Sequence, residues 1–281
     1  MKKITAKKIN DFENYLYEEE KSDATIEKYI RDIKYFDKWL EQQEFTKKDV
    51  LEYKKYLINN YAPKSVNSVL SSLNSFFEYN RWYDLKVKTI KIQRQMFADN
   101  GKEITKSEYE RLLLAASKKS NKRLYYLMQT ICSTGIRVSE LKYITVEAVR
   151  KKQAVIDLKG KMRVVILPSQ LCAILKKYIE KEKIKSGSVF VTKTGIPLNR
   201  SNIWNDMKKL CYEANVSKSK VFPHNLRHLF AKTYYSLQKD IVRLADILGH
   251  SNVNTTRIYT IESGEIHRKQ IQSLPLVRLL I

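Results

Sequence analysis

Glycine, proline and cysteine are scarce in this chain, which has 7 glycines, 5 prolines and 3 cysteines among 281 residues. So few glycines exclude a glycine-rich phosphate loop, and the shortage of turn-forming residues favours long helices. The cysteines, Cys132, Cys172 and Cys211, are far apart, odd in number and without a Cys-x-x-Cys pair. A disulfide framework and a zinc knuckle are therefore not expected.

Long apolar runs are also missing. No stretch approaches the roughly 20 apolar residues that span a bilayer. The N-terminal sequence MKKITAKKIN leads into a polar amphipathic segment instead of a signal-peptide core. The sequence therefore predicts a protein without membrane attachment that is located in the cytoplasm.

Acidic residues are outnumbered, because 53 lysines and arginines against 30 aspartates and glutamates leave a formal net charge of +23 at pH 7. With 43% hydrophobic and 11% aromatic residues, the chain can build a core, which excludes a disordered polycation. A folded protein with this excess of cations is typical of one that binds a polyanion, since neutralising phosphates releases condensed counterions. Nucleic acid is the expected partner.

Helical periodicity fills two regions of the chain. Apolar residues recur every three or four positions between Ile26 and Leu40, and a further helix is predicted from Pro63 to Phe77. The stretch 86–103 loses this pattern and is rich in cations, which indicates an interdomain linker. We therefore predict a helical N-terminal domain over 1–85 and a second domain over 104–281 that ends in a tail, 262–281.

The second domain is predicted to be mostly helical with one small β-hairpin. It opens with a capping box from Thr105 to Glu108. Two β-branched runs, 154–158 and 163–167, flank Lys159 to Met162 and predict a hairpin with lysines at its tip. A short strand is predicted at 189–192, and helices are predicted at 169–185, 202–214, 226–237 and 241–248.

Polar residues interrupt the apolar pattern at three places, and the first is CSTGIRVSELKYI. Arg137 follows a helix-ending Thr-Gly pair there and begins a new helix. Its guanidinium can bind an oxyanion near the helix N-terminus, or it can form an ordinary surface ion pair with Glu140. The sequence leaves both interpretations open.

The second place is FPHNLRHLFAKTYY, where His224, Arg227 and His228 fall near one edge of a helix. A histidine pair four residues apart can bind a metal, but zinc needs three or four ligands and the glutamate of an HExxH motif is absent. His224 and Arg227 suit a phosphodiester instead, with the imidazole moving a proton and the guanidinium holding charge. His228 is predicted to be a packing residue whose polar atoms are satisfied.

The third place is LADILGHSNVNTTRIYT, where a helix is predicted to end at Gly249, to expose His250 and to resume before Tyr259. A phenol can attack phosphorus covalently when cations offset the charge that develops on the phosphoryl oxygens and the phenolate. One tyrosine among 18 is a weak signal by itself. An ordinary surface or core tyrosine is the alternative.

In their order these segments resemble the tyrosine recombinase or phage integrase family, in particular its compact Xer-like and transposon integrase members. TGIRVSEL resembles the box with the first catalytic arginine, and LKGKMRVVILP resembles the hairpin with the catalytic lysine. HNLRHLFA resembles the box with the second arginine, and LGHSNVNTTRIYT resembles the closing box with the nucleophile. SDATIEKYIRDIKYFDKWL and SVNSVLSSLNSFFEY resemble the family's helical core-binding domain.

The resemblance implies a site-specific recombinase that cleaves and rejoins DNA through a 3′-phosphotyrosyl intermediate. Tyr259 is then the nucleophile, Lys159 protonates the leaving 5′-oxygen, and His224 assists proton transfer. The other implied roles are charge stabilisation, by Arg137, Arg227 and His250, and positioning of the first arginine, by Glu140. The family needs neither metal nor ATP, and the chain has no acidic cluster typical of a two-metal nuclease, so no cofactor is expected.

The resemblance also implies how the protein meets DNA. It predicts a mainly α, C-shaped clamp of two domains on double-stranded DNA with short inverted-repeat core sites, within the nucleoid. It predicts a homotetramer that exchanges strands through a Holliday junction, alone or with a paralogous recombinase or accessory protein. The tail docks on its own domain or on a neighbouring subunit. Expected DNA contacts are Lys28, Arg31, Lys64, Ser65 and Asn67 in the first domain, and Arg200 and Asn202 in the second.

Two other functions stay open. An enzyme like type IB topoisomerase shares the cleavage chemistry without recombination, but the predicted core-binding domain and the apolar tail disfavour it. A DNA-binding regulator that only keeps the fold should lack at least one catalytic position, and no such position is missing here.

Overall fold

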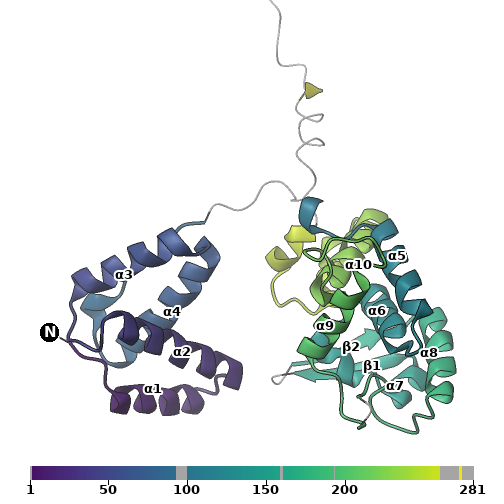
Figure 1. The fold of residues 1–281 in the computed structure, drawn as a ribbon, viewed down its shortest axis with the longest axis horizontal. Helices are drawn as coiled ribbons and strands as arrows, with labels where there is room; N and C mark the ends of the chain where they lie inside the picture. Colours follow the sequence, from purple (N-terminus) through teal and green to yellow (C-terminus); the bar gives the residue numbers. More distant parts are fainter. Residues whose placement is uncertain (1, 93–99, 159–160, 193, 260–271, 274–281) are drawn as a thin grey trace, which may run out of the picture. The chain divides into compact units, whose positions relative to one another are not determined.

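A computed structural model describes residues 2–92, 100–158, 161–192, 194–259 and 272–273 of the chain. The chain divides into two compact units, Met1–Arg94 and Gln95–Ile281, and each unit has its own hydrophobic core (Figure 1). Lys159 and nearly all of the expected tail lie outside the described residues.

Unit 1 is a bundle of α1 (Ala6–Glu18), α2 (Asp23–Trp39), α3 (Lys47–Asn60) and α4 (Pro63–Tyr79), followed by the 3-10 turn η1 (Tyr83–Leu85). α2 packs against α4, and Phe36, Phe76 and Phe77 from these helices are completely buried. Pro63 begins α4, where its missing N–H costs no hydrogen bond. The two helices predicted from apolar periodicity are confirmed.

The first residues of the expected linker belong to unit 1, because two asparagines of α4 hold them. Asn74 accepts from the Val87 N–H at 2.9 Å and donates to the Val87 carbonyl at 2.8 Å. Asn67 makes the same pair of bonds with the backbone of Ile90, at 2.7 and 2.9 Å. The side-chain amides satisfy an extended backbone that has no strand beside it, so the chain as far as Ile90 lies on α4.

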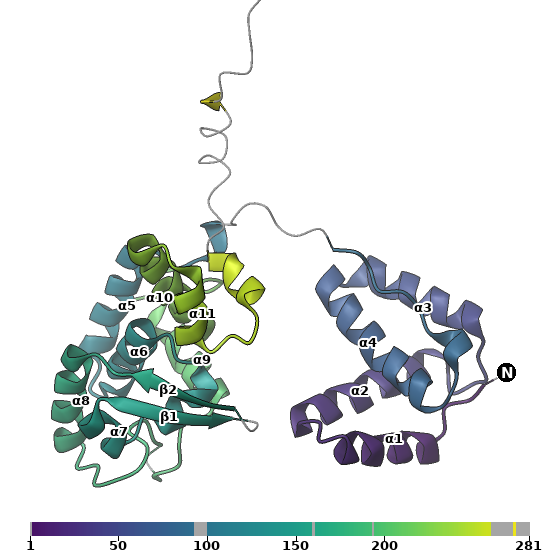
Figure 2. The ribbon, with the colours of Figure 1, turned by 180° about the vertical axis from the view of Figure 1, so that it is seen from behind.

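Unit 2 is mostly helical. In chain order it contains η2 (Asn100–Lys102), α5 (Lys106–Lys118), α6 (Arg123–Thr134), η3 (Val138–Tyr143), α7 (Val146–Lys151), β1 (Gln153–Leu158), β2 (Lys161–Ile166), α8 (Ser169–Lys181), α9 (Arg200–Leu210), α10 (Pro223–Gln238), α11 (Ile241–Leu248) and η4 (Val253–Tyr259). The predicted capping box at Thr105 and Glu108 is present at the start of α5. α7 packs on β1, and α8 packs on both α6 and α7 (Figure 2).

The predicted β-hairpin is confirmed, with a shifted boundary. β1 and β2 are antiparallel with Val155 opposite Val164 and Ile156 opposite Arg163. Lys161 belongs to β2, although the sequence predicted it in the turn, because its cross-strand pairing extends the ladder toward the tip. Ile156 is buried, while Val155 and Val164 on the opposite face are about half exposed.

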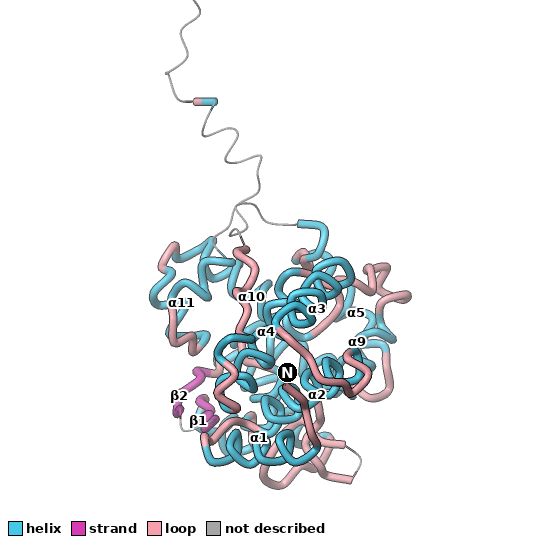
Figure 3. The backbone as a smooth tube through the Cα atoms, turned by 90° about the vertical axis from the view of Figure 1, so that its left-hand side faces the viewer, coloured by secondary structure: helices cyan, strands magenta, loops and turns pink. Residues whose placement is uncertain are grey.

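The predicted strand at 189–192 is wrong. The described residues there form only isolated bridges, from Thr145 to Ser188 and from Val191 to Pro197. Pro197 has no N–H with which to continue a ladder. β1 and β2 are therefore the only strands in the part of the chain that the structure describes (Figure 3).

The helices after the hairpin match the prediction with small shifts at their ends. α8 ends at Lys181 instead of 185, α9 begins at Arg200, and α10 begins with Pro223 in its first turn. The expected fold class, mainly α with one small hairpin, is confirmed. No described helix is long and apolar enough to cross a membrane.

Candidate active site

Segments far apart in the sequence meet at the end of α11 in unit 2. α6 ends at Thr134, and its C-cap residue Gly135 has a φ of +63°, which turns the chain so that Arg137 is the N-cap residue of η3. α10 supplies Arg227, and the chain after α11 supplies His250 and, at the end of η4, Tyr259. The structure therefore brings together candidate site residues from three motifs that are separate in the sequence.

Arg227 is at the centre of this cluster and only 1% exposed. Its guanidinium donates to the carbonyl oxygens of Gly135 at 2.5 Å and Leu248 at 2.8 Å, and to Nε2 of His250 at 2.9 Å. Burial and the charge of Arg137 lower the pKa of Arg227 to about 10, so it stays protonated at neutral pH. Fixed carbonyl acceptors thus hold a rigid cation inside the fold.

His250 has one defined tautomer, because a guanidinium can only donate. Its Nε2 must accept from Arg227, so Nδ1 carries the proton and donates to the hydroxyl of Thr256 at 2.8 Å. Partial burial and the charges of Arg227 and Arg137 lower the pKa of His250 to about 4. His250 is therefore neutral at pH 7 and orients the buried guanidinium.

Arg137 is anchored at one side and 38% exposed. It donates from Nη1 to Glu140 Oε1 at 2.9 Å and from Nη2 to the carbonyl of Gly249 at 3.1 Å. Glu140 is 2% exposed and also accepts from the Arg137 backbone N–H at 2.9 Å. The ion pair and the oxyanion site, which the sequence left as alternatives, are compatible, since Glu140 anchors a guanidinium that remains partly accessible.

Tyr259 lies within the cluster and is 3% exposed. Its ring stands edge-on to His228 at 4.8 Å and nearly parallel to His250 at 6.2 Å. Burial raises the pKa of Tyr259, while the charge of Arg227 and a hydrogen bond to it act in the opposite direction. The phenol is therefore neutral and lies beside the cation that would stabilise its phenolate.

His224 and His228 are neighbours on α10, and their rings meet edge to face at 4.7 Å. Desolvation on the packed side of the ring and the charge of Arg227 lower the pKa of His224. Burial and the neighbouring His224 lower the pKa of His228 to about 4. The prediction that His228 is a packing residue is confirmed, because its ring packs on Tyr259. The prediction that its polar atoms are satisfied is wrong, because its buried Nδ1 has no hydrogen-bond partner among the described residues.

Arg163 on β2 also belongs to the cluster, and the sequence interpretation missed it. Its Nη1 donates to the Ile247 carbonyl at 2.7 Å, and its Nη2 bonds Glu140 Oε2 at 2.5 Å. The available signal was an arginine between two apolar neighbours of the strand, Met162 and Val164. Only the register shows that these apolar neighbours face outward and the arginine inward.

Lys28 in unit 1 is engaged in a network of its own. Its ammonium lies 2.7 Å from the carboxylate of Asp32 and donates to the Ser68 carbonyl at 2.5 Å and to the Ser72 hydroxyl at 2.7 Å. These partners use all three ammonium donors. Lys28 therefore has a structural role here, and its expected DNA contact would require this network to open.

The other residues expected to touch DNA in unit 1 differ in availability. Asn67 is committed to the backbone of Ile90. Arg31, Lys64 and Ser65 are exposed, so these three are the accessible members of the predicted set.

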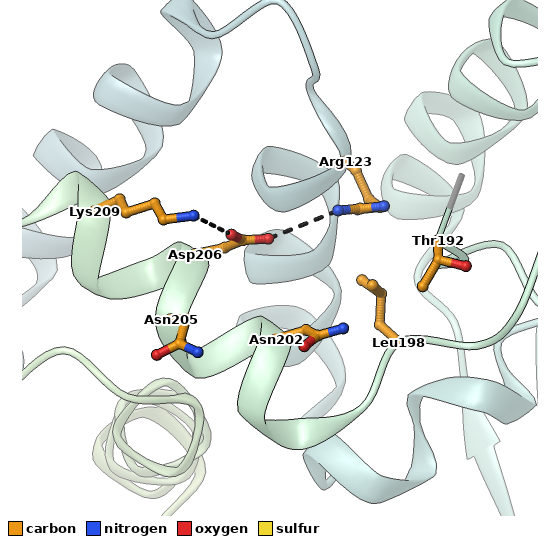
Figure 4. Close-up of a pocket in the computed structure, with 7 residues that line it drawn as sticks. All are labelled: Arg123, Thr192, Leu198, Asn202, Asn205, Asp206 and Lys209. Carbon is orange, nitrogen blue, oxygen red and sulfur yellow. Dashed lines mark hydrogen bonds and ion pairs between the residues drawn. The ribbon is translucent and has the colours of Figure 1, made fainter. Parts of the chain in front are cut away.

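Arg200 and Asn202 lie in the first turn of α9 and are exposed. The charge of Arg200 contributes to lowering the pKa of His224, so this guanidinium lies near the cluster. Asn202 lines a pocket of about 300 Å³ with Arg123, Asp206 and Lys209 among others (Figure 4). The carboxylate of Asp206 forms ion pairs with both cations of this pocket, at 3.7 Å from Arg123 and 3.2 Å from Lys209.

The cluster is suited to phosphoryl transfer. It offers fixed positive charge, neutral imidazoles and a phenol, which are the groups that stabilise a charged phosphoryl transition state and attack phosphorus. In the described part of the chain, no group of three or more histidine, cysteine, aspartate or glutamate side chains is arranged to hold a metal ion.

Comparison with known proteins places this fold and site. The model of the phage integrase family matches residues 102–265, and the model of the phage integrase N-terminal SAM-like domain matches residues 9–83. Fold and site define an enzyme that breaks and rejoins DNA, a tyrosine-type site-specific recombinase. The chain belongs to the phage integrase family.

Relatives match nearly the whole chain. Tyrosine recombinase XerD of Staphylococcus saprophyticus is 30% identical over 269 residues, covering 88% of this chain and 91% of the relative. Tyrosine recombinase XerA of Thermococcus kodakarensis is 29% identical over 283 residues, covering 97% of each chain. Among solved structures, a lambda integrase dimer bound to a COC′ core site is 16% identical with a TM-score of 0.74, covering 91% of this chain and 94% of the other. That last likeness concerns the fold.

Proposed function

We propose that this recombinase cleaves one DNA strand through Tyr259, with a 3′-phosphotyrosyl intermediate, and rejoins it to a new partner strand. The observation that carries the proposal is the hydrogen-bonded cluster of Arg137, Arg227 and His250 beside Tyr259. The alternative of a DNA-binding regulator has no support in this cluster, because binding alone does not need a buried phenol next to a buried guanidinium.

Tyr259 supplies the nucleophile in this proposal. Its oxygen attacks the scissile phosphorus, the bond from phosphorus to the 5′-oxygen breaks, and the DNA leaves with a free 5′-hydroxyl. The new phosphodiester to tyrosine keeps the energy of the broken bond, so a 5′-hydroxyl can reverse the step without ATP. Metal ions are not part of the proposed reaction.

The arginines supply electrostatic stabilisation. Arg227 is held by carbonyls and His250, and Arg137 is held by Glu140. Both guanidiniums would bind the non-bridging phosphoryl oxygens, whose charge grows as the tyrosine attacks. Arg137 is already partly accessible, whereas Arg227 is 1% exposed and Tyr259 is 3% exposed. The phosphate therefore reaches Arg227 and Tyr259 only after the residues around them rearrange on DNA binding.

Proton transfer completes the scheme. The phenol is neutral, so its proton must leave as it attacks, and His224 on the exposed side of α10 is the proposed acceptor. Lys159 is the proposed donor to the leaving 5′-oxygen, and it lies outside the described residues. His250 is proposed to assist charge stabilisation by orienting Arg227.

Assembly on DNA is part of the same proposal. Solved structures similar in fold include a lambda integrase dimer on a core site and a lambda integrase tetramer on a Holliday junction. We extend this arrangement to the present chain, with two domains clamping an inverted-repeat site in the cytoplasm and four protomers exchanging strands. The net charge of +23 supports it, because phosphate contacts release counterions.

The first prediction tests the nucleophile. Reactions of the protein with host genomic DNA are stopped with SDS, protein-linked DNA is captured, and the attached ends are sequenced. We expect adducts at one short inverted repeat with the unchanged protein and none with Tyr259→Phe, because phenylalanine keeps the ring and lacks the attacking oxygen. Tyr234→Phe, in a tyrosine packed against the same small core cluster, is the matched control and should retain the adducts.

Each other result counts against part of the proposal. Adducts that persist in Tyr259→Phe would show that another residue attacks. Adducts scattered over many sequences would favour a topoisomerase-like relaxing enzyme. An unchanged protein that forms no adduct would contradict covalent catalysis by this chain on its own.

A further inference from the structure

The C-terminal end of α11 is the point at which three arginines meet. The carbonyls of Ile247, Leu248 and Gly249 follow one another in the chain, and each accepts from a different guanidinium. Arg163 bonds the first at 2.7 Å, Arg227 the second at 2.8 Å and Arg137 the third at 3.1 Å. The last carbonyls of a helix have no partner within the helix and carry partial negative charge, so this end is a natural acceptor for cations.

Arg163 differs from the other two arginines because it comes from the β-hairpin. It lies on the inward face of β2, opposite Ile156, and its side chain is 16% exposed. This orientation makes it a tie between the hairpin and the end of α11. The same strand leads back to the hairpin tip, where the sequence has Lys159.

Glu140 connects Arg163 to Arg137. The carboxylate is 2% exposed and is shared, with Oε1 on Arg137 and Oε2 on Arg163. Two guanidinium charges on one carboxylate leave a net positive charge for a phosphate. Without Arg163, Arg137 would be the one cation among the described residues that is paired with this buried carboxylate, and its attraction for a DNA oxygen would fall.

The packing of the backbone is fitted to Arg163 as well. Gly249 has a φ of +64°, and a Cβ built there would lie 2.5 Å from Cδ of Arg163. The arginine stem therefore occupies the space that a side chain at position 249 would need. Since the next residue is His250, Arg163 also contacts the turn that presents this histidine to Arg227.

We propose that Arg163 is a positioning residue for the recombination reaction, which holds Glu140 and the end of α11 so that Arg137 is aligned for the phosphate. The proposal rests on the proposed function, since it assumes that Arg137 binds the scissile phosphate. It adds a residue that couples the placement of the β1–β2 hairpin to the arginine pair. Arg163 itself does not touch DNA in this proposal.

The test measures single-turnover cleavage of a duplex that contains the site mapped by the adduct experiment. The variants are Arg163→Met, which keeps the stem and removes the guanidinium, and Arg163→Lys, which keeps the charge but cannot reproduce the planar fork. Arg150→Met and Arg150→Lys, at an exposed arginine of α7, are the matched controls. A circular dichroism melt of each variant monitors folding.

We expect Arg163→Met to slow cleavage by about 100-fold, the cost of a small misplacement of a catalytic group, with DNA binding nearly unchanged. The loss should be smaller on DNA with a methylphosphonate at the scissile position, because that linkage lacks one charged oxygen and depends less on Arg137. Arg163→Lys should lose rate in the same pattern, so it provides the test if the methionine variant does not fold. The Arg150 variants should cleave normally.

Other outcomes separate the possibilities. A third substrate has sulfur in place of the 5′-bridging oxygen, so its leaving group needs no proton from an acid. If the loss of cleavage rate disappears on this substrate, the link to Arg137 is overturned, and Arg163 would instead support proton donation by Lys159 of the hairpin. An equal loss of cleavage rate on all three substrates would show that Arg163 has a general structural role and would overturn the proposal. Unchanged cleavage by the Arg163 variants would overturn it as well. If the unchanged protein forms no covalent adduct, the proposed function fails and this inference fails with it. If the unchanged protein forms adducts but the Arg163 variants do not show the expected pattern of losses, this inference fails alone.

Discussion

The charge state of each residue in the cluster follows from what it is bonded to. Among the described residues, Arg227 donates to two carbonyls and to the Nε2 of His250. These acceptors offset part of the effect of burial and of the charge of Arg137, which lower its pKa only to about 10, so Arg227 keeps its positive charge at neutral pH. Burial, followed by the charges of Arg227 and Arg137, lowers the pKa of His250 to about 4 and keeps its imidazole neutral at pH 7. The positive charge that a phosphate meets at this point therefore comes from the guanidinium groups and not from the imidazole of His250.

The second prediction concerns pH and the stability of the fold. The pKa values of His228 and His250 are lowered to about 4 from an ordinary 6.5, so the unfolded chain binds these protons more tightly than the folded chain. The contribution of the two neutral histidines to the free energy of unfolding should be fully present above pH 6.5. The free energy of unfolding should decrease as the pH falls from 6.5 toward 4. Thermal melts across this interval measure the effect.

His228→Phe is the informative variant for this prediction. It keeps an aromatic ring against Tyr259 and removes one titrating group. Its melting temperature should depend less steeply on pH over the same interval. A melting temperature of the unchanged protein that is constant between pH 6.5 and 4 would contradict the buried neutral state of the histidines.

At the scale of elements, the end of α11 organises the site. The carbonyls at its end accept from Arg163 of β2, Arg227 of α10 and Arg137, the N-cap residue of η3. Gly249 ends the helix in the left-handed region with a φ of +64°, which is typical of helix C-termini. The helix and its cap could be predicted from the sequence, because Gly249 stands directly after the apolar pattern, but the identity of the three donors could not.

The third prediction compares two glycines with similar backbones. Gly249→Ala should destabilise the fold by about 2–4 kcal/mol, since it adds overpacking against Arg163 to the cost of the left-handed conformation. Gly195→Ala should cost only about 1 kcal/mol, because Gly195 has a φ of +80° but nothing within 4 Å of its added Cβ. Denaturant unfolding of both variants measures the difference. Equal destabilisation would contradict the close approach of Arg163 to Gly249.

At the scale of the whole molecule, each unit has a core of its own. Unit 1 closes around aromatic side chains such as Phe12, Phe36 and Phe76. The core of unit 2 gathers residues from α5 through α10. The division of labour proposed for the enzyme, a helical domain that binds DNA and a second domain that carries the chemistry, has this physical basis.

The fourth prediction follows from the closed core of unit 1. A fragment of residues 1–92 should fold by itself into a helical, cooperatively melting domain. A fragment of residues 1–80 should melt at a lower temperature, because it loses the buried Leu85 and Val87 and leaves Asn67 and Asn74 without the backbone they bind. Circular dichroism melts of the two fragments test this. Identical melting temperatures would mean that the segment up to Ile90 does not stabilise unit 1.

Four features could be predicted from the amino-acid sequence: the helices with strong apolar periodicity, the hairpin, the excess of positive charge and the order of the motifs that resemble a tyrosine recombinase. These features depend on residues a few positions apart, so a local pattern is enough to predict them. Three features could be seen only in the folded chain: Arg163 shares Glu140 with Arg137, Lys28 is paired with Asp32, and Nδ1 of His228 has no hydrogen-bond partner among the described residues. Each of these depends on which strand face or helix end meets a distant partner, and that is set by packing and register.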